Sequence, residues 1–579
     1  MIKRLLPFMR GYRRQAIAAP FWVSVETVCE LILPLLMAAI IDDGIQKGDM
    51  SAILKNGGLM LVMSMLSLTG GILAAKFAAQ AAQGLGASLR QAEFEQINAF
   101  SFGDIDRFST ASLVTRMTND VTQIQNMVSM CLRMLVRSAV MMIVAIIVAC
   151  SISVRLATYV LVIMPLVILM VGLMMKFIGP LFGVMQKKID GLNQVIQENL
   201  IATRVVKAFV RQEHEREKFR AANNALTEAG LNAIMRMMAM MPLMMLGMNL
   251  ATVLILYNGG QMVLHSELEI GQLSSILTYI FNILFSVMMV GMSLLMFTRA
   301  KASAGRIFEV LDTVPAIADG AEEMPQGKER GLVEFRNVSF RYAAGGTGDD
   351  VLRNISFTAQ PGQTVAIVGG TGSGKSTLVN LIPRFYDVTA GSILLDGRDV
   401  RDYKLDDLRG RIGMVLQNNV LFSGTIRENL LWGNPDATEE DMIQAAKDAQ
   451  AYDFVMSFPD GFDTHMEQGG VNVSGGQKQR LCIARAMLRH PEVLILDDST
   501  SAVDSTTEAQ IRQSFHDNLK DTTVLLIAQR ISSVRNADLI LVLEDDTIVD
   551  AGTHEELMAT SSVYQEIYYS QQEGVSENG

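Results

Sequence analysis

One stretch decides much of the fold: Gly369-Gly370-Thr371-Gly372-Ser373-Gly374-Lys375-Ser376. It follows an apolar run, residues 364–368, that is typical of a buried strand, and it precedes a helical pattern. The glycines let backbone N–H groups approach phosphate oxygens, while the lysine adds a positive charge and the serine a hydroxyl group. The stretch therefore predicts a phosphate-binding loop between a strand and a helix.

Two segments downstream of this loop suit the same kind of site. The run Val493-Leu494-Ile495-Leu496-Asp497 predicts a buried strand that ends in a carboxylate, and strand ends deliver side chains to the ligand crevice. We expect Asp497 to hold Mg²⁺ through water. The segment Ser474-Gly475-Gly476-Gln477 precedes a helix, which favours an anion site built from N–H groups, although an ordinary capped helix has the same pattern.

Composition places the chain among membrane proteins. Of its 579 residues, 50% are hydrophobic and 19% are charged, and the mean hydropathy is +0.27. Long apolar stretches predict about six membrane-spanning helices. These stretches are residues 15–41, 56–79, 132–153, 156–178, 237–264 and 273–297. The first is too long for the core of a cleavable signal peptide, so we expect it to remain as an anchor.

The distribution of charge adds orientation and excludes one class of partner. The basic N-terminus belongs on the cytoplasmic side by the positive-inside rule, and six spans return the C-terminus to the same side. Of the net charge of −11, residues up to Arg330 carry about +5 and the remainder about −16, which argues against nucleic-acid binding. No CxxC pair occurs, and we expect all four cysteines to be small buried residues. They are Cys29, Cys131, Cys150 and Cys482.

The pattern changes after residue 297 and predicts a two-domain chain. We expect a transmembrane domain over residues 1–314 with two long cytoplasmic helical extensions, a linker over 315–330, and an α/β domain over 331–579. Short apolar runs that alternate with helical stretches indicate the α/β sheet. They are residues 333–340, 364–368, 412–416, 493–496, 524–527 and 539–543.

The phosphate loop, Ser474-Gly475-Gly476-Gln477 and Leu496-Asp497, in this order, resemble ATP-binding cassette proteins. Because apparent membrane helices precede the cassette, the whole chain resembles a half-transporter of the bacterial multidrug exporter type. The resemblance implies a six-helix transmembrane domain followed by a cytoplasmic α/β P-loop cassette in the cell inner (plasma) membrane. It also implies an ATPase that uses ATP and Mg²⁺ to export hydrophobic or amphiphilic compounds by alternating access. Membrane lipid is an implied partner of the transmembrane domain.

The same resemblance assigns roles to individual residues. Tyr342, just before the strand that leads to Lys375, is similar to the aromatic residue that stacks on adenine. Gln417 is similar to the switch glutamine that contacts metal and water. Implied metal-binding residues are Ser376, Gln417 and Asp497. Implied nucleotide-binding residues are Tyr342, Gly369, Gly370, Thr371, Gly372, Ser373, Gly374, Lys375, Ser376 and Thr377, with Ser474, Gly475, Gly476 and Gln477 facing a second subunit's ATP. Residues 501–504 resemble the inter-subunit loop, and residues 102–108 and 204–209 resemble the two coupling regions.

Two positions depart from the family pattern. The catalytic glutamate after the metal aspartate is here Asp498, and the switch histidine is Gln529. The shorter Asp498 would place its carboxylate roughly 1 Å or more from the position that orients water, and such misplacement can cost about 100-fold. Gln529 lacks the positive charge available to histidine. Together with Gln417, Asp498 and Gln529 are the catalytic candidates. The two departures predict a heterodimer in which this chain contributes a degenerate ATP site and an intact signature segment, Ser474-Gly475-Gly476-Gln477. The alternative is a slow homodimer with Asp498 as the base.

The substrate stays open at this point. A lipid or peptide translocator and a non-transporting sensor subunit are alternatives on the same scaffold. Glu26 and Glu30 share one face of the first span, where they either bind a cationic substrate or pair with Arg133 or Arg137. The methionine-rich residues 237–248 either line a multidrug cavity or form packed or lipid-facing surface.

Overall fold

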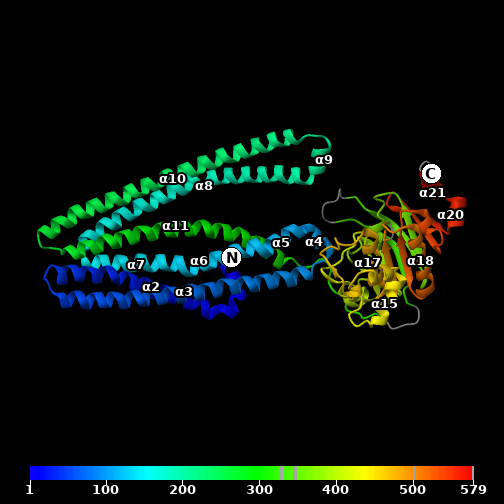
Figure 1. The fold of residues 1–579 in the computed structure, drawn as a ribbon, viewed down its shortest axis with the longest axis horizontal. Coiled ribbons are helices and arrows are strands. Elements are labelled where there is room, and N and C mark those ends of the chain that lie inside the picture. The colour runs from blue at the N-terminus through cyan, green and yellow to red at the C-terminus, as the bar shows by residue number, and fades with distance from the viewer. Residues whose placement is uncertain (325–329, 343–348, 500–501, 577–579) are drawn as a thin grey trace. The chain divides into compact units, whose positions relative to one another are not determined.

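The computed structural model describes residues 1–324, 330–342, 349–499 and 502–576, apart from some side chains between residues 160 and 295 and beyond residue 571. The chain forms two compact units (Figure 1). The first comprises Met1–Gln96 and Ala111–Thr313, and the second comprises Ile97–Thr110 and Val314–Gly579. The second unit thus takes in residues 97–110, which the sequence-based boundaries place in the transmembrane domain.

The first unit consists of long helices. Its α-helices are α1 (Ile2–Leu5), α2 (Arg13–Ala39), α3 (Met50–Asn98), α5 (Thr110–Thr115), α6 (Val121–Met130), α7 (Val136–Ile152), α8 (Val154–Ile201), α9 (Thr203–Ala208), α10 (Gln212–Leu264) and α11 (Ile270–Asp312). Tighter or wider helical turns join several of them: η1 (Pro7–Tyr12), η2 (Ile40–Ile45), η3 (Arg116–Asp120) and η4 (Cys131–Leu135). Such helices satisfy their own backbone hydrogen bonds, as a chain within a bilayer must.

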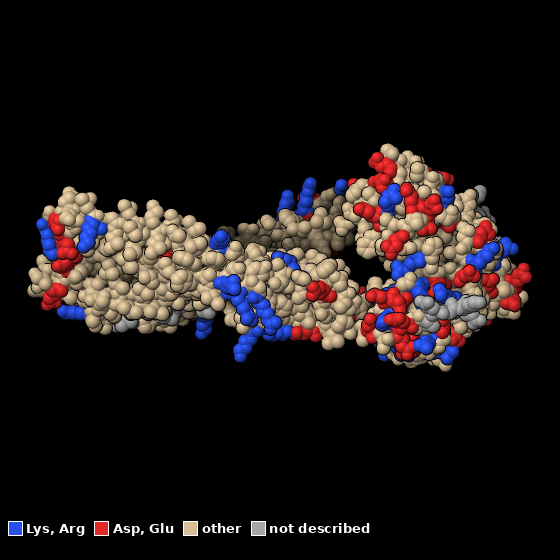
Figure 2. Space-filling model, turned by 90° about the horizontal axis from the view of Figure 1, so that it is seen from below, with Lys and Arg blue, Asp and Glu red and all other residues tan. Residues whose placement is uncertain are grey.

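Four helical stretches within the described residues are long and apolar enough to cross a membrane. They are Pro7–Ile45, Met50–Asn98, Thr110–Ile152 and Ile270–Val287. The apolar parts of α8 and α10 include residues outside that search, so the number of six spans stays a prediction. On the face shown in Figure 2, the middle of the helical unit carries few charged residues, whereas charges are dispersed over the second unit.

Polar contacts fix α11 against α2 inside the first unit. Tyr279 is fully buried, and its hydroxyl donates to the carbonyl oxygen of Leu31. Asp42, just beyond α2, accepts hydrogen bonds from the backbone N–H groups of Gly271 at 2.6 Å and Gln272 at 3.1 Å. A carboxylate at this place caps the first turn of α11, so the end of the first apolar segment is tied to the start of the last.

The second unit is built on strands. A six-stranded sheet has the order β12-β11-β3-β10-β9-β6, a four-stranded sheet has the order β2-β1-β4-β5, and β7 pairs with β8. In the larger sheet only the β11–β12 pair is antiparallel. The strands are β1 (Val333–Phe340), β2 (Leu352–Ala359), β3 (Thr364–Gly369), β4 (Ala390–Leu395), β5 (Arg398–Asp399), β6 (Ile412–Val415), β7 (Gly424–Thr425), β8 (His465–Met466), β9 (Val493–Asp497), β10 (Thr523–Ile527), β11 (Leu539–Glu544) and β12 (Thr547–Gly552).

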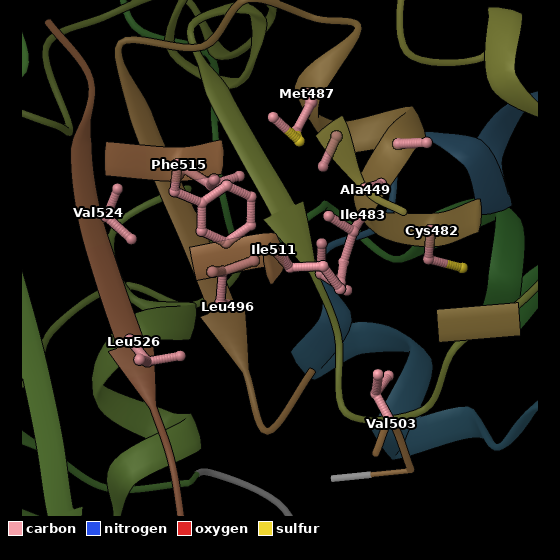
Figure 3. Close-up of a cluster of buried hydrophobic side chains, with 14 of the residues drawn as sticks. Ala449, Cys482, Ile483, Met487, Leu496, Val503, Ile511, Phe515, Val524 and Leu526 are labelled. Atoms are coloured by element: carbon pink, nitrogen blue, oxygen red, sulfur yellow. The ribbon is translucent and has the colours of Figure 1, made fainter. Parts of the chain in front are cut away.

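Helices cover these sheets and close the core. They are α4 (Phe102–Phe108), α12 (Lys375–Asn380), α13 (Leu405–Gly410), α14 (Ile426–Leu431), α15 (Glu439–Asp448), α16 (Tyr452–Met456), η5 (Gly461–Asp463), α17 (Gly475–Met487), α18 (Ser505–Asn518), α19 (Ile531–Val534), α20 (His554–Thr560) and α21 (Ser562–Ser576). Figure 3 shows Ile483 of α17, Leu496 of β9 and Phe515 of α18 in one buried cluster. This packing fixes the positions of the helices and strand ends that carry the site.

All six predicted strands are present, with bounds that differ by a residue or so. The sequence pattern does not predict strands such as β2 and β4, because they mix polar and apolar residues without a long continuous apolar run. The expectation of four buried cysteines is wrong for two of them. Cys29 and Cys482 are buried, whereas Cys131 and Cys150 are partly exposed.

Candidate functional site

The predicted phosphate loop lies between β3 and α12. Gly374 has φ +84°, and a Cβ there would lie 2.7 Å from the carbonyl oxygen of Val351, so glycine is required at this close approach. The helix that follows, α12, has only 6 residues. A helix of this length contributes a limited dipole, so the loop N–H groups and Lys375 are the main groups that the loop offers to an anion.

Lys375 is held beside the loop by backbone oxygens. Its Nζ donates to the carbonyl oxygen of Gly369 at 2.9 Å and to that of Gly370 at 2.6 Å. Burial lowers the pKa of Lys375, whereas the negative charges of Asp497 and Asp498 raise it. The ammonium group therefore lies at the loop, and no carboxylate of the described residues forms an ion pair with it.

Ser376 and Asp497 meet at the end of β9. Ser376 Oγ donates to Asp497 Oδ1 at 2.9 Å, and Asp497 is buried. Burial raises the pKa of Asp497, the hydrogen bond from Ser376 lowers it, and the charge of Asp498 raises it. A hydroxyl and a carboxylate oxygen are the hard donors that Mg²⁺ prefers, so the pair fits this ion. Gln417 is exposed beyond the neighbouring strand β6, and no hydrogen bond within the described residues joins it to the pair.

The two departures from the family pattern are in direct contact. Gln529 Nε2 donates to Asp498 Oδ2 at 2.8 Å. Burial raises the pKa of Asp498, while the hydrogen bond from Gln529 and the charges of Lys375 and Arg530 lower it. The net shift of the Asp498 pKa is upward, so the Gln529 amide opposes the effect of burial without cancelling it, and its hydrogen bond occupies Asp498 Oδ2.

The segment Ser474-Gly475-Gly476-Gln477 begins α17, as the sequence predicts. Ser474 Oγ accepts from the Gln477 backbone N–H at 3.3 Å, and Gln477 Oε1 accepts from the Ser474 N–H at 2.9 Å. This reciprocal cap fixes the start of the helix. Ser474 and Gly475 are exposed, and among the described residues no hydrogen bond joins them to residues 369–376. The structure therefore does not bring this segment to the chain's own phosphate loop.

Gln479 links α17 to the catalytic candidates, although nothing in the sequence singles it out. Its Nε2 donates to the carbonyl oxygen of Asp498 at 3.3 Å, and its Oε1 accepts from the Ala502 N–H at 3.1 Å. Gln479 thus joins the signature helix to the predicted inter-subunit loop, of which Ser501 lies outside the described residues.

Gln571 plays a similar part from the C-terminal helix α21. Its Nε2 donates to the carbonyl oxygen of Gln529 at 2.7 Å, and its Oε1 accepts from the Ile531 N–H at 2.9 Å. One amide therefore holds both sides of the loop that carries the switch position. No local sequence pattern indicates this, because the partners are about 40 residues apart.

The geometry agrees with comparisons to known proteins. Residues 17–288 match the family model of the ABC transporter transmembrane region, and residues 352–501 match the family model described as ABC transporter. YfiB of Bacillus subtilis, an uncharacterized ABC transporter ATP-binding protein, is 41% identical over 98% of this chain and 98% of its own length. The chain belongs to the ABC transporter family.

Further similarities define the kind of ABC transporter. YgaD of Bacillus subtilis, whose name proposes multidrug export, is 34% identical over 98% of this chain and 99% of its own. The ATP-dependent lipid A-core flippase of Syntrophus aciditrophicus is 36% identical over 84% of this chain and 80% of its own. The structure of a bacterial Atm1-family ABC exporter with ATP bound has a TM-score of 0.82 and 25% identity, covering 97% of this chain and 99% of that one. The predicted fold class is confirmed, and the chain is an ABC exporter half-transporter with an ATP-binding ATPase cassette.

In this ABC exporter, the adenine-stacking candidate Tyr342 lies beside α12. Its hydroxyl oxygen is 3.0 Å from Thr377 Oγ1, and its ring meets that of Tyr386 edge-on with centroids 5.2 Å apart. The expectation that Tyr342 directly precedes the strand leading to Lys375 is wrong. It follows β1, and β2 intervenes before β3, because β1 and β2 pair as antiparallel neighbours. The adenine contact itself stays a prediction.

The first coupling candidate, residues 102–108, forms α4 and contacts the cassette within the second unit. The rings of Phe102 and Phe385 have centroids 4.5 Å apart, and the hydroxyl of Tyr386 donates to Asp106 Oδ2 at 2.9 Å. Burial and the charge of Asp106 raise the pKa of Tyr386 well above its usual range, so the phenol stays protonated and donating. The second candidate, residues 204–209, corresponds to α9 and ends in an exposed Phe209.

The acidic residues of the first apolar segment have a partner in the first unit, which we call the membrane unit from here on. Arg137 on α7 donates to both Glu26 and Glu30 on α2. This confirms the ion-pair alternative and selects Arg137 rather than Arg133. The structure does not distinguish whether the methionine-rich residues 237–248 line a cavity or form packed or lipid-facing surface, because several of their side chains lie outside the described part of the chain. These are Met240, Met241 and Met244.

Proposed function

We propose that this chain exports hydrophobic or amphiphilic compounds across the cell inner (plasma) membrane as one half of a heterodimer. ABC exporters of this kind work as dimers. In the proposed arrangement both termini and the cassette are cytoplasmic, and this chain's own ATP site is slow. Its segment Ser474 to Gln477 completes a competent site on a different half-transporter.

The contact between Gln529 and Asp498 carries this proposal. A general base must accept a proton from water in a defined position, and the short Asp498 carboxylate already accepts a hydrogen bond from the Gln529 amide. A neutral amide also cannot supply the positive charge that stabilises a γ-phosphate in the transition state. The family's catalytic glutamate and switch histidine are both replaced at this site, whereas the helix cap at Ser474 is intact. This combination supports a dimer of two different subunits in which only the partner's ATP site hydrolyses ATP rapidly.

The remaining residues support ATP binding at this slow site. We expect Lys375 to hold the β/γ-phosphates, Tyr342 to stack on adenine, and Ser376 and Asp497 to hold Mg²⁺ with Gln417 nearby. Mg²⁺ when bound neutralises phosphate charge. ATP binding then closes the two cassettes, α4 transmits the movement to the membrane helices, and hydrolysis resets the dimer.

Two experiments test the heterodimer. The tagged chain is purified in mild detergent and the co-purifying proteins are identified, with a different half-transporter expected in equal amount. The complex then receives Asp498→Asn in this chain or a Glu→Gln change at the partner's corresponding glutamate. We expect the partner variant to abolish ATP hydrolysis and Asp498→Asn to change it less than about twofold.

A charge control separates site effects from general ones. Asp521→Asn removes an exposed aspartate two residues before β10 and should leave hydrolysis unchanged. If Asp498→Asn abolishes hydrolysis while the partner variant keeps it, this chain's site is the working one. A homodimer on purification, with Asp498 required, would instead establish the slow homodimeric exporter.

A lipid translocator is the second candidate, because one relative is named as a lipid A-core flippase. It predicts that phospholipid or glycolipid headgroups stimulate ATP hydrolysis in liposomes more than hydrophobic drugs do. A peptide translocator would respond to neither, and a sensor subunit would hydrolyse ATP without moving any compound into vesicles.

A further inference from the structure

A cavity of about 530 Å³ lies among α2, α6, η4, α7 and α11 of the membrane unit. Its size falls in the range of small-molecule sites, roughly 300–1,000 Å³. Three charged side chains line it: Glu26, Arg133 and Arg137. A charge inside a membrane protein is costly unless it is paired or used for binding, so each of the three needs an explanation. We refer to this space as the arginine-lined cavity.

The carboxylates at this cavity are already engaged. One guanidinium, that of Arg137, donates to Glu26 through Nη1 and to Glu30 through Nη2. The backbone of α3 covers Glu26, since a Cβ at Gly71 would lie 3.3 Å from the Glu26 carboxyl carbon. The Glu26 side chain is consequently only 20% exposed. A cationic ligand would have to displace Arg137 from both carboxylates.

Arg133 differs from Arg137 in having no acidic neighbour of this kind. It lies one helical turn before Arg137, so both guanidinium groups are on the same face of the η4–α7 stretch. Its side chain is exposed to the cavity, and among the described residues no carboxylate forms an ion pair with it. The two carboxylates, Glu26 and Glu30, are both bound to Arg137, so the Arg133 guanidinium is the charged group of the lining that is left to contact a bound anion.

The rest of the cavity wall combines the polar side chains of Asn126, Ser129, Ser138 and Ser286 with apolar ones that suit a chain of variable shape. Beside the charged groups it presents the side chains of Met130, Met134, Met141, Met289 and Phe285. Thioethers are flexible and polarisable, so they adapt to different alkyl or ring systems without a specific fit. A charged head and a soft apolar wall in one cavity match an amphiphilic ligand.

We propose that the arginine-lined cavity binds amphiphiles with an anionic headgroup, a carboxylate or a phosphate, and that Arg133 is the headgroup contact. The inference rests on the proposed export of amphiphilic compounds and narrows their class. Arg137 organises the wall through its two carboxylates, and the methionines contact the apolar chain.

The test uses the full complex, with its partner, in nanodiscs of phosphatidylcholine. ATP hydrolysis is titrated with three twelve-carbon probes: laurate, dodecyl phosphate and dodecyltrimethylammonium. We expect stimulation by one or both anionic probes and none by the cation, and the two anionic arms distinguish a carboxylate from a phosphate ligand. Arg133→Gln should raise the half-stimulating concentration at least about tenfold, since a charge-assisted contact is lost. Arg133→Lys should restore most of the response.

A matched control is Arg155→Gln, which removes an exposed arginine from the start of α8, outside the cavity lining, and should leave all three titrations unchanged. Equal stimulation by the cationic probe, or an unchanged response in Arg133→Gln, would overturn the inference while leaving amphiphile export intact. If no probe stimulates hydrolysis and none is carried into proteoliposomes, both the inference and the proposed amphiphile export are wrong.

Discussion

The cassette and the membrane unit each place one cation beside two carboxylates, and they use this arrangement in opposite ways. In the cassette, Lys375 donates to backbone carbonyl oxygens rather than to either aspartate. Asp497 accepts from Ser376, and Asp498 accepts from Gln529. The three charges are thus held by neutral donors and acceptors, which leaves the cation available to phosphate and Asp497 available to a metal, while Asp498 Oδ2 is occupied by the Gln529 amide.

In the membrane unit, Arg137 binds both Glu26 and Glu30 directly. The charges neutralise one another, and the cluster becomes a link between α2 and α7. The difference teaches that a set of charges prepared for a ligand is held by uncharged groups, whereas a structural set is satisfied by its own members. Arg133, which lacks a carboxylate partner among the described residues, does not belong to the structural set.

The largest effect should come from removing the cassette cation. We expect Lys375→Ala to weaken ATP binding at this chain's own site by about 100-fold, because Lys375 is the cation that we propose to contact the β/γ-phosphates. Photolabelling with an azido-ATP analogue, resolved by subunit, measures it. Lys404→Ala is the control, since Lys404 is an exposed lysine paired with Glu323 in the same cassette. Unchanged labelling of the Lys375→Ala chain would show that the loop does not bind ATP as assigned.

Removing the membrane cation should affect stability instead of nucleotide binding. Arg137→Met leaves two carboxylates without a cation and should destabilise the unit by about 1–3 kcal/mol. The apparent Tm in detergent should fall by several degrees. The control is the triple variant Glu26→Gln, Glu30→Gln and Arg137→Met, which removes all the charges and should recover most of the loss. A single variant as stable as the wild type would mean that the cluster is not structural.

The sequence predicts the cassette site far better than the membrane cluster, for a physical reason. Phosphate binding needs a fixed backbone geometry, so the loop up to Ser376 and the strand ending at Asp497 are local patterns with little freedom. The reciprocal cap at Ser474 is equally local, because its partners are three residues apart. Such elements can be found without knowing the fold.

The remaining contacts join residues that are distant along the chain. Arg137 is 111 residues from Glu26, and Gln571 is 42 residues from Gln529. The sequence alone left Arg133 and Arg137 as equal candidates for the acidic pair, because helix spacing places both on one face and only packing against α2 selects one of them. Strand β2 was missed for a related reason: its burial comes from pairing with β1 and not from its own pattern.

A smaller effect is expected from restoring the family residues. Asp498→Glu combined with Gln529→His should raise ATP turnover at this chain's own site by about tenfold, measured in a complex whose partner site is silenced. The single variants should gain less than the double variant, since the two side chains contact one another and their effects are coupled. If the double variant shows no gain in turnover, Asp498 and Gln529 are not the cause of slow hydrolysis at this site. The proposal that these two residues make the site degenerate would then be wrong.

The smallest effect should come from Gln571, whose side chain contacts the backbone of the switch loop rather than the side chain of a catalytic candidate. Its side-chain amide donates to the Gln529 carbonyl and accepts from the Ile531 N–H, so it fixes the loop that carries the switch position. In the Asp498→Glu, Gln529→His background, Gln571→Ala should lower kcat about two- to fivefold and leave KM for ATP unchanged. The loss of roughly 1 kcal/mol in hydrogen bonding allows the switch side chain to move without altering the phosphate loop. Gln565→Ala is a close control, because Gln565 lies on the same helix α21 but donates to the Met558 carbonyl instead of the switch loop. If both variants lower kcat equally, α21 acts through general packing, whereas an effect confined to Gln571 identifies it as a positioning residue for the switch.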